Sequence, residues 1–135
     1  MKVLVDTCVW SRALRRGRSE DDPVVRALED LIRDMRVQMI GPIRQELLSG
    51  IRSSGQFESL RVQLNSFPDI LIETQDYERA AEFFNRCREN GIQGSNTDFL
   101  ICAIAVRCSM PIFTVDKDFT LFRKHLPIEL FEIPT

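Results

Sequence analysis

The sequence contains a single histidine, His125, and no G-x-S-x-G turn. A Ser-His-Asp or Cys-His mechanism would have to use this histidine, which stands in a Lys-His-Leu-Pro context near an expected helix end, where a solvated side chain is the simpler role. No C-x-x-C pair is present among the four cysteines. Because the cysteines fall mostly among apolar neighbours, we expect buried free thiols at Cys8, Cys87, Cys102 and Cys108.

Glycine-rich nucleotide-binding patterns are missing as well. Neither G-x-G-x-x-G nor a P-loop pattern occurs, which argues against dinucleotide or P-loop nucleotide binding. No apolar run approaches the roughly 20 residues that a membrane span requires. Lys2 is followed directly by an expected strand, without a signal-peptide pattern, so we expect a cytoplasmic protein with no membrane segment. With 135 residues, 44% hydrophobic and 28% charged, we expect one globular domain over residues 1–135.

The chain also lacks the large positive charge that is typical of nucleic-acid-binding proteins, because its net charge is −2. Four carboxylates gathered in one pocket would change this interpretation, since removing four negative charges leaves +2 for the remaining surface. A weakly basic surface around an acidic pocket is compatible with a polyanion held through a metal.

The first seven residues, Met-Lys-Val-Leu-Val-Asp-Thr, predict a buried strand that ends on a carboxylate. Val3, Leu4 and Val5 form a continuous apolar run without polar alternation, as in a central parallel strand covered on both faces. In open α/β sheets the binding crevice lies outside the carboxyl ends of the strands. We therefore expect Asp6 to lie at that crevice.

The rest of the chain alternates expected strands with helices. Asp22-Pro23 predicts a helix start, Gly41-Pro42 another, and Asn90-Gly91 a helix end, with a break over residues 50–55. Further strands are expected at residues 37–40, 70–72, 111–115 and 128–133. This order predicts an α/β fold with a central parallel five-stranded sheet and helices on both faces.

Four carboxylates are expected at one end of this sheet. Asp6 and Asp116 each end an apolar strand, Glu46 lies in the helix after the second strand, and Asp98 lies at the start of an apolar helix. Like charges this close repel one another unless a cation intervenes. The natural cation for an all-oxygen set is Mg²⁺ or Mn²⁺, which can activate water for displacement at phosphorus.

Each of these acids also has a simpler role open to it. Asp98 fits a capping box with the serine three residues before it, and Glu46 fits a solvated helical acid. Asp116 fits a turn or the cap of a short helix, for which Asp118 competes. Asp6 is the hardest to dismiss, because a carboxylate directly after a buried strand requires a partner.

Basic residues follow Asp6 closely. Arg12, Arg15 and Arg16 fall on one helical face, and Arg18 lies just beyond it. A solvated basic face and an edge that contacts phosphates are both open for these residues. Substrate specificity would lie in the expected loops over residues 15–22 and 53–56.

Four segments together resemble a known family. V-L-V-D-T, P-I-R-Q-E-L-L-S-G, D-F-L-I-C-A-I-A and T-V-D-K-D-F occur in the order and spacing of PIN-domain ribonucleases. The short single-domain form resembles, more narrowly, a VapC-type toxin of a bacterial or archaeal toxin–antitoxin pair. The resemblance extends from residue 1 to about residue 122.

The resemblance implies a Mg²⁺- or Mn²⁺-dependent endoribonuclease with a parallel five-stranded sheet. It implies a homodimer and a VapB-like antitoxin whose flexible C-terminal segment lies across the active-site groove. Thr7 matches the hydroxyl position of the family near the metal, and Asn96 stands where many relatives have another acid, which leaves one or two metals open. The acids that the resemblance assigns to catalysis and to the metal are Asp6, Glu46, Asp98 and Asp116.

Two other functions remain open from the sequence. The first is a catalytically idle PIN-like module that binds RNA or a protein, although the presence of all four acids favours an enzyme. The second is a receiver-like phosphoacceptor domain, which requires an acid pair after its first strand. Here Asp6 is followed by Thr7, Cys8 and Val9, so this second alternative is disfavoured.

Overall fold

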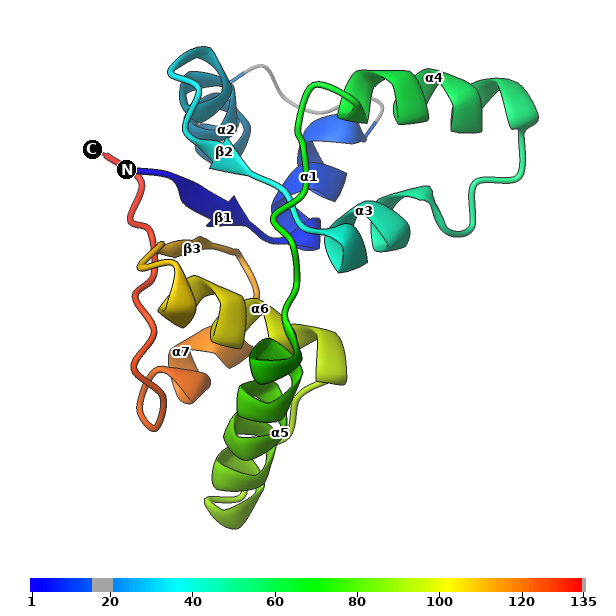
Figure 1. Ribbon diagram of the computed structural model, residues 1–135. Helices are drawn as coiled ribbons and strands as arrows, with labels where there is room; N and C mark the ends of the chain where they lie inside the picture. Colours follow the sequence, from blue (N-terminus) through cyan, green and yellow to red (C-terminus); the bar gives the residue numbers. More distant parts are fainter. Residues whose placement is uncertain (16–20, 135) are drawn as a thin grey trace.

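The computed structural model describes residues 1–15 and 21–134, and a parallel sheet forms its centre (Figure 1). The strand order is β2 (Val37–Gln38), β1 (Val3–Val5) and β3 (Ile112–Phe113). Val3 is in register with Val37, and Leu4 with Ile112. All three residues of β1 are fully buried, which confirms the central strand predicted from the apolar run.

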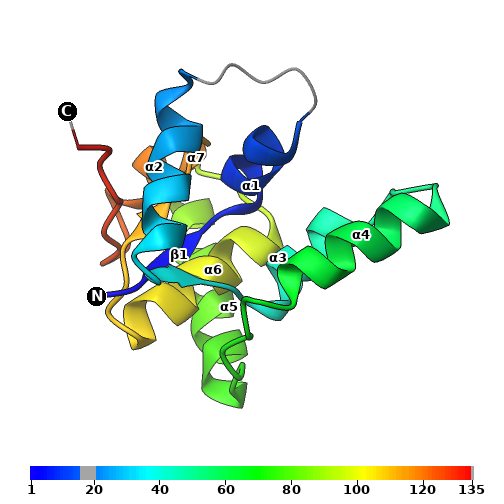
Figure 2. The ribbon, with the colours of Figure 1, turned by 90° about the horizontal axis from the view of Figure 1, so that it is seen from above.

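Helices cover both faces of this sheet, as predicted. Figure 2 shows α1 (Thr7–Leu14) and α2 (Pro23–Arg33) on one side of β1, and α5 (Thr74–Glu89) and α6 (Asn96–Arg107) on the other. The remaining helices are α3 (Gly41–Leu48), α4 (Ser54–Leu64) and α7 (Asp118–Phe122).

The helix boundaries follow local signals in the sequence. Asp22 accepts a hydrogen bond from the Val24 backbone N–H at 2.9 Å, and Pro23 occupies the first helical turn of α2. At the end of α5, Gly91 has a φ of +75°, a conformation in which a side chain would be strained. Helix α6 is buried from Phe99 to Ala105, as its almost continuous apolar sequence predicts.

The prediction of five strands is wrong for the described residues, in which three strands form. The segments expected as the third and fifth strands each make a single parallel bridge, Met39 with Asp69 and Ile112 with Leu130. In the first of these segments Leu71 is 81% exposed, so the segment cannot be a strand buried on both faces. Two prolines, Pro127 and Pro134, flank the second and restrict how far a ladder can extend there.

The expected break over residues 50–55 is shorter than predicted, because α4 begins at Ser54. Ser53 caps the helix by accepting a hydrogen bond from the Gln56 backbone N–H. Only Leu64 of α4 is buried, and the helix projects from the molecule (Figure 1). Arg44 of α3 fixes the C-terminal end of α4. It donates hydrogen bonds to the Leu64 carbonyl at 3.0 Å, to the Phe67 carbonyl and to the Asp69 carboxylate at 2.9 Å.

Aromatic rings close the core between α5, α6 and α7. The rings of Phe99 and Phe122 have centroids 4.8 Å apart, and Phe84 contacts Phe99 edge-on at 5.6 Å. Gly94 passes so close that a Cβ there would lie 2.6 Å from the Phe122 ring. The loop between α5 and α6 is thereby held against the core.

All four cysteines are free, as predicted, with Cys87 and Cys102 buried and Cys8 and Cys108 half-buried. Burial raises the pKa of the Cys102 thiol far above its ordinary value. Within the described part of the chain, no helix has the length and apolar character that crossing a membrane would require.

Candidate active site

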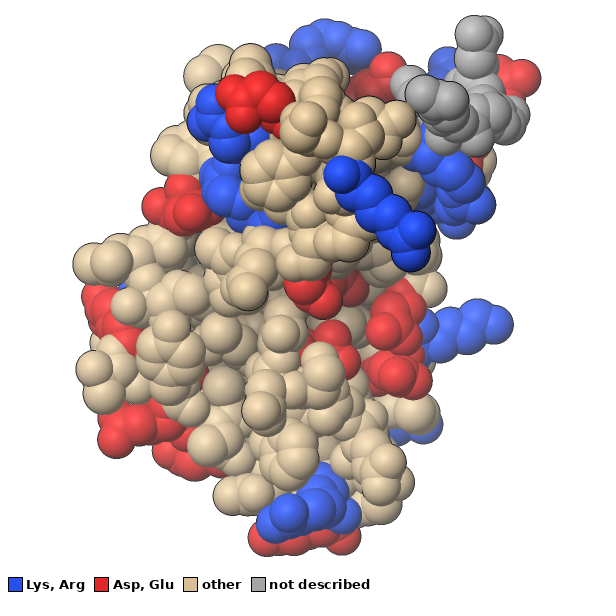
Figure 3. Space-filling model, turned by 90° about the vertical axis from the view of Figure 1, so that its right-hand side faces the viewer, with Lys and Arg blue, Asp and Glu red and all other residues tan. Residues whose placement is uncertain are grey.

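Acidic side chains gather on the face toward which the strands run. Figure 3 shows this face, the right-hand side of Figure 1, with Asp and Glu side chains around a hollow near its middle and Lys and Arg side chains above them. Four elements place the predicted acids. Asp6 ends β1, Glu46 lies in α3, Asp98 lies in the first turn of α6, and Asp116 follows β3.

Asp6 is 6% exposed, and several groups hold its carboxylate in place. Its Oδ1 accepts a hydrogen bond from the Thr7 backbone N–H at 2.8 Å, so the carboxylate caps α1. Its Oδ2 accepts from the Thr114 hydroxyl at 2.8 Å and from the Cys8 thiol at 3.4 Å. A buried carboxylate requires such partners, and these fix the direction in which Asp6 faces the hollow.

Thr7 joins the first strand to the second acid. Its hydroxyl donates a hydrogen bond to Glu46 Oε1 at 2.9 Å, across 39 positions of sequence. Glu46 is exposed and has no resolved ion pair with a described Lys or Arg. The alternative of a purely solvated helical acid is therefore incomplete, because Glu46 is tied to the residue beside Asp6.

Asp98 forms the capping box that the sequence suggested. Its Oδ2 accepts from the Ser95 backbone N–H at 3.1 Å, and the Ser95 hydroxyl accepts from the Asp98 backbone N–H at 3.1 Å. Burial raises the pKa of Asp98, and the negative charges of Asp6 and Asp116 raise it further. The capping role and proximity to the other acids are thus both present.

Asp116 also caps its own turn. Its Oδ1 accepts from the Asp118 backbone N–H at 2.9 Å, at the start of α7. Its backbone N–H donates to the Thr114 hydroxyl at 3.0 Å. Thr114 therefore connects Asp6 and Asp116 through one oxygen atom. Of the two alternatives expected for Asp116, the structure shows the turn, because the N-cap of α7 is Lys117 and receives no side-chain cap bond.

The chemistry of this set fits a hard divalent cation. Hydrogen bonds from described residues occupy only one carboxylate oxygen in three of the acids, so Glu46 Oε2, Asp98 Oδ1 and Asp116 Oδ2 have no protein donor within that part of the chain. Oxygen ligands of this kind suit Mg²⁺ or Mn²⁺. Over residues 1–15 and 21–134, however, no three His, Cys, Asp or Glu side chains lie close enough together to hold a metal ion as they stand.

Of the basic residues after Asp6, Arg12 has a structural role. Arg12 forms an ion pair with Asp22 at 2.6 Å, so it joins α1 to the start of α2. Arg15 is exposed, and Arg16 and Arg18 lie outside the described residues. The loop expected to carry specificity over residues 15–22 is likewise described only at its ends.

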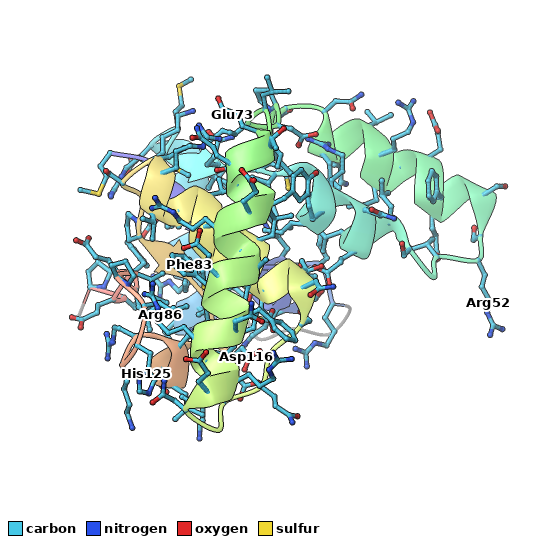
Figure 4. All side chains as sticks on the ribbon, turned by 60° about the horizontal axis from the view of Figure 1, so that its bottom comes forward. Arg52, Glu73, Phe83, Arg86, Asp116 and His125 are labelled. Carbon is cyan, nitrogen blue, oxygen red and sulfur yellow. The ribbon has the colours of Figure 1, made fainter. Side chains whose placement is uncertain are left out.

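His125 lies away from the acids and follows α7, near the helix end that its sequence context predicted. Figure 4 shows it beside Arg86, while Asp116 lies on the other side of α5. The His125 carbonyl accepts a hydrogen bond from Arg86 at 3.3 Å. A histidine-dependent mechanism at the acidic hollow therefore has no support in this geometry.

The sequence assigned no role to Thr114 or Cys8, although both contact Asp6. The Cys8 sulfur lies 3.4 Å from the Thr114 hydroxyl and accepts from the Val115 backbone N–H at 3.4 Å. The available signal was the hydroxyl two residues before Asp116, which suits a local hydrogen bond to the backbone. Its bond to Asp6, across 108 positions, had no local signal.

The chain is similar in sequence and in fold to several known proteins. Ribonuclease VapC11 of Mycobacterium tuberculosis is 29% identical over 126 residues, covering 90% of this chain and 92% of the relative. The fold is similar to FitAcB from Neisseria gonorrhoeae, with a TM-score of 0.76, 21% identity and 96% of each chain covered. It is equally similar to VapBC2 from Rickettsia felis, solved with a fragment of promoter DNA, with a TM-score of 0.76, 19% identity and 98% of each chain covered.

A family model supplies the decisive comparison. The model described as PIN domain matches residues 3–124, which include all four predicted acids and every strand of the sheet. The match starts at β1 and ends just after α7, so it covers the same elements that bring the acids to one edge of the sheet. The chain therefore belongs to the PIN domain family.

Proposed function

We propose that this protein is a Mg²⁺- or Mn²⁺-dependent endoribonuclease that hydrolyses RNA phosphodiester bonds and acts as the toxin of a type II toxin–antitoxin pair. The observation that carries the proposal is the convergence of four acids from four elements, three of them with a carboxylate oxygen that no described protein group bonds. The name of the 29% identical relative, a VapC ribonuclease, supports the same reaction.

The residues that would hold the cation are Asp6, Glu46, Asp98 and Asp116, and the same residues would be catalytic. When bound, a divalent cation supplies an activated water and offsets negative charge on the phosphate. A cation also relieves the repulsion among the acids, which in its absence raises the pKa of Asp98 together with burial. The donor set therefore fits the metal that the family implies.

The protein's own hydrogen bonds would orient these acids before RNA arrives. Thr7 orients Glu46 and Thr114 orients Asp6, while the Ser95 backbone N–H fixes one oxygen of Asp98. Preorganised charges of this kind need little rearrangement during the reaction. Asp6, which directly follows β1, and Asp98, which lies in α6, would then both act at the scissile phosphate.

Control by a partner is the second part of the proposal. One protein of similar fold, from Klebsiella pneumoniae, was solved as a toxin–antitoxin complex. By this analogy we expect a homodimer in the cytoplasm and a VapB-like antitoxin that covers the acidic hollow. An enzyme of this kind would harm its own cell if it were always active, which gives the partner its purpose.

A calorimetric titration tests the metal site directly. Wild-type protein titrated with Mn²⁺ should bind it, and Asp6→Asn should lose most of the heat. In parallel, purified protein with Mg²⁺ should cut total RNA at mapped positions, and Asp6→Asn should not. Equal affinity of the wild type and Asp6→Asn for Mn²⁺ would contradict the proposed metal site.

The remaining alternative is a catalytically idle PIN module that binds RNA or protein. The same two measurements separate it from the nuclease, because an idle module would bind RNA without cutting it at any Mg²⁺ or Mn²⁺ concentration.

A further inference from the structure

A groove beside the acidic hollow has a lining that the proposed reaction does not yet use. It lies between α3, α5 and the start of α6 and has a volume of about 580 Å³. This volume falls within the roughly 300–1,000 Å³ of typical small-ligand sites. Gln45 lines it next to Glu46 in sequence, and Asn96 and Thr97 line it directly before Asp98. Two of the helices that carry the acids therefore also form the groove.

The lining combines flat apolar surface with amide groups. Tyr77, 57% exposed, and Phe84 supply aromatic rings on the α5 side. Gln45, Asn85 and Asn96 supply carboxamides, which both donate and accept hydrogen bonds. Among the described residues, none of those that line the groove carries a charge. A neutral, planar ligand edged by donors and acceptors matches this lining.

The side chain of Arg88 contacts two residues that line the groove. The Arg88 guanidinium lies 5.6 Å from the Phe84 ring centroid and donates to Asn85 Oδ1 at 3.3 Å, so two groove residues hold it. It forms no ion pair with an acid of the described residues. Its positive charge is therefore available to an anion that enters the groove.

We infer that this groove binds one unpaired nucleotide of the RNA substrate, with its base against Tyr77 and the amides and its phosphate at Arg88. Unpaired bases are recognised by stacking on aromatic side chains and by hydrogen bonds to their edges. The inference rests on the proposed ribonuclease function and adds to it the residues that would select the cleavage site. A nucleotide here would lie beside the phosphate that the acids hold.

The same helix offers a matched control for Arg88. Arg86 also lies over a ring of α5, 5.5 Å from the Phe83 centroid. It points to the other side, where it meets the His125 carbonyl, and Figure 4 shows Arg86 and Phe83 together on that side. Replacing Arg86 changes the net charge of the protein as replacing Arg88 does, but leaves the groove intact.

The experiment measures binding and cleavage separately. Binding of a fluorescent single-stranded RNA oligonucleotide is followed by anisotropy in an Asp98→Asn background, with Mg²⁺ and over a range of salt concentrations. Arg88→Gln should weaken binding about tenfold and lower the salt slope by about 1, and Arg86→Gln should change neither. Tyr77→Ala should also weaken binding. In proteins with Asp98 intact, Gln45→Ala and Asn85→Ala should relax the base preference at one position next to the cut.

Each outcome decides a different claim. If the groove variants cut RNA at unchanged positions, and Arg88→Gln and Arg86→Gln bind RNA with equal affinity, the groove would not be a nucleotide-binding site. The proposed nuclease activity would still stand. If the wild-type protein never cuts RNA and the groove variants lose RNA binding, the groove would be supported as an RNA-binding site and the proposed nuclease activity would be contradicted. Dissociation of a dimer by Tyr77→Ala, with base preference retained, would show that a second copy of this chain fills the groove, which also overturns the inference.

Discussion

Asp98 illustrates at the scale of one residue how a structural role and a functional role share a side chain. One carboxylate oxygen closes the capping box with Ser95, and the other has no donor among the described residues. Burial and the charges of Asp6 and Asp116 raise the pKa of this carboxyl group, so folding disfavours its ionised form relative to the unfolded chain. The contribution of Asp98 to stability is therefore present at low pH and lost as the pH rises through the raised pKa.

This electrostatic cost makes Asp98→Asn an informative variant. The asparagine keeps an oxygen that can accept from Ser95 but removes the charge. We expect metal-free Asp98→Asn to melt at an equal or higher temperature than wild type at pH 7, and RNA cleavage to fall to background. Thermal unfolding with EDTA at pH 7 and pH 5 measures the first effect, and the advantage of the variant should shrink at pH 5. A clearly lower melting temperature would mean that the capping role dominates.

Thr114 acts at the same scale as a positioning residue. Its hydroxyl donates to Asp6 and accepts from the Asp116 backbone N–H. Thr114→Val keeps the shape of the side chain but leaves Asp6 Oδ2 with only the Cys8 thiol as donor and removes the acceptor of the Asp116 backbone N–H, so we expect a loss of about 1–3 kcal/mol in the free energy of unfolding. We also expect weaker Mn²⁺ binding in calorimetry, because Asp6 loses its orientation.

Thr114→Ser provides the control, since it restores the hydroxyl. Recovery of Mn²⁺ affinity in this variant would separate positioning from packing. If Thr114→Val bound Mn²⁺ as wild type does, the hydroxyl would have only a structural role.

At the scale of elements, an ion pair joins the start of α5 to the end of α6. Asp76 is 2% exposed and accepts from Arg107 at 2.7 and 2.9 Å, while Arg107 also donates to the Leu71 carbonyl at 3.0 Å. Burial alone would raise the pKa of Asp76, but hydrogen bonds from Arg107 and the Glu73 backbone lower it overall. The pair therefore fixes the segment that precedes α5 as well as the two helices.

Arg107→Met leaves the buried carboxylate of Asp76 without its partner. We expect it to lose about 3 kcal/mol of the free energy of unfolding at pH 7. Because the folded pKa of Asp76 is lowered, the contribution of the pair is present above the ordinary pKa of aspartate and is lost as the pH falls below it. Urea unfolding at pH 7 and pH 3 should show a large difference from wild type that shrinks in acid.

The exposed pair of Arg33 with Asp30 supplies the comparison. Its side chains are 72% and 66% exposed, so Arg33→Met should leave the urea midpoint unchanged within error. Equal effects of the two substitutions would contradict the structural role given to Arg107.

At the scale of the whole molecule, the predicted acids gather on one face (Figure 3). The acids come from segments spread over residues 6–116, and two of them follow strands of the sheet whereas Glu46 and Asp98 lie on α3 and α6. Every strand of the described sheet runs the same way, so all carboxyl ends open onto that face. An antitoxin that covers this face would block RNA from the acids.

The proposed toxin activity has a cellular test. Expression of the wild-type protein in a bacterial host should arrest growth, and co-expression of the adjacent upstream reading frame should restore it. Asp6→Asn should be harmless, because it removes an acid of the proposed metal site. Growth curves and RNA extracted from arrested cells provide the measurements. If the wild-type protein cuts RNA in vitro but its expression does not slow growth, the nuclease activity would be supported and the toxin role would be contradicted.

The sequence by itself determined the features that depend on neighbours in the chain. The apolar run Val3–Val5 predicted the buried central strand, and Asp22-Pro23 and Asn90-Gly91 predicted a helix start and a helix end. Placing Asp6 directly after a strand likewise followed from local patterns, whereas β3 ends at Phe113, before the predicted strand end at Asp116. These predictions succeed because apolar periodicity and capping groups act within a few residues.

Only the tertiary structure decided which distant groups meet. Residues 70–72 and 128–133 fit strand patterns, yet each segment makes a single bridge. Leu71 is exposed to solvent in the first segment, and Pro127 and Pro134 flank the second. The bond of Thr114 to Asp6 and that of Arg107 to Asp76 span 108 and 31 positions. Such pairs depend on how helices and strands pack against one another, and no local pattern encodes the distance between two segments far apart in the chain.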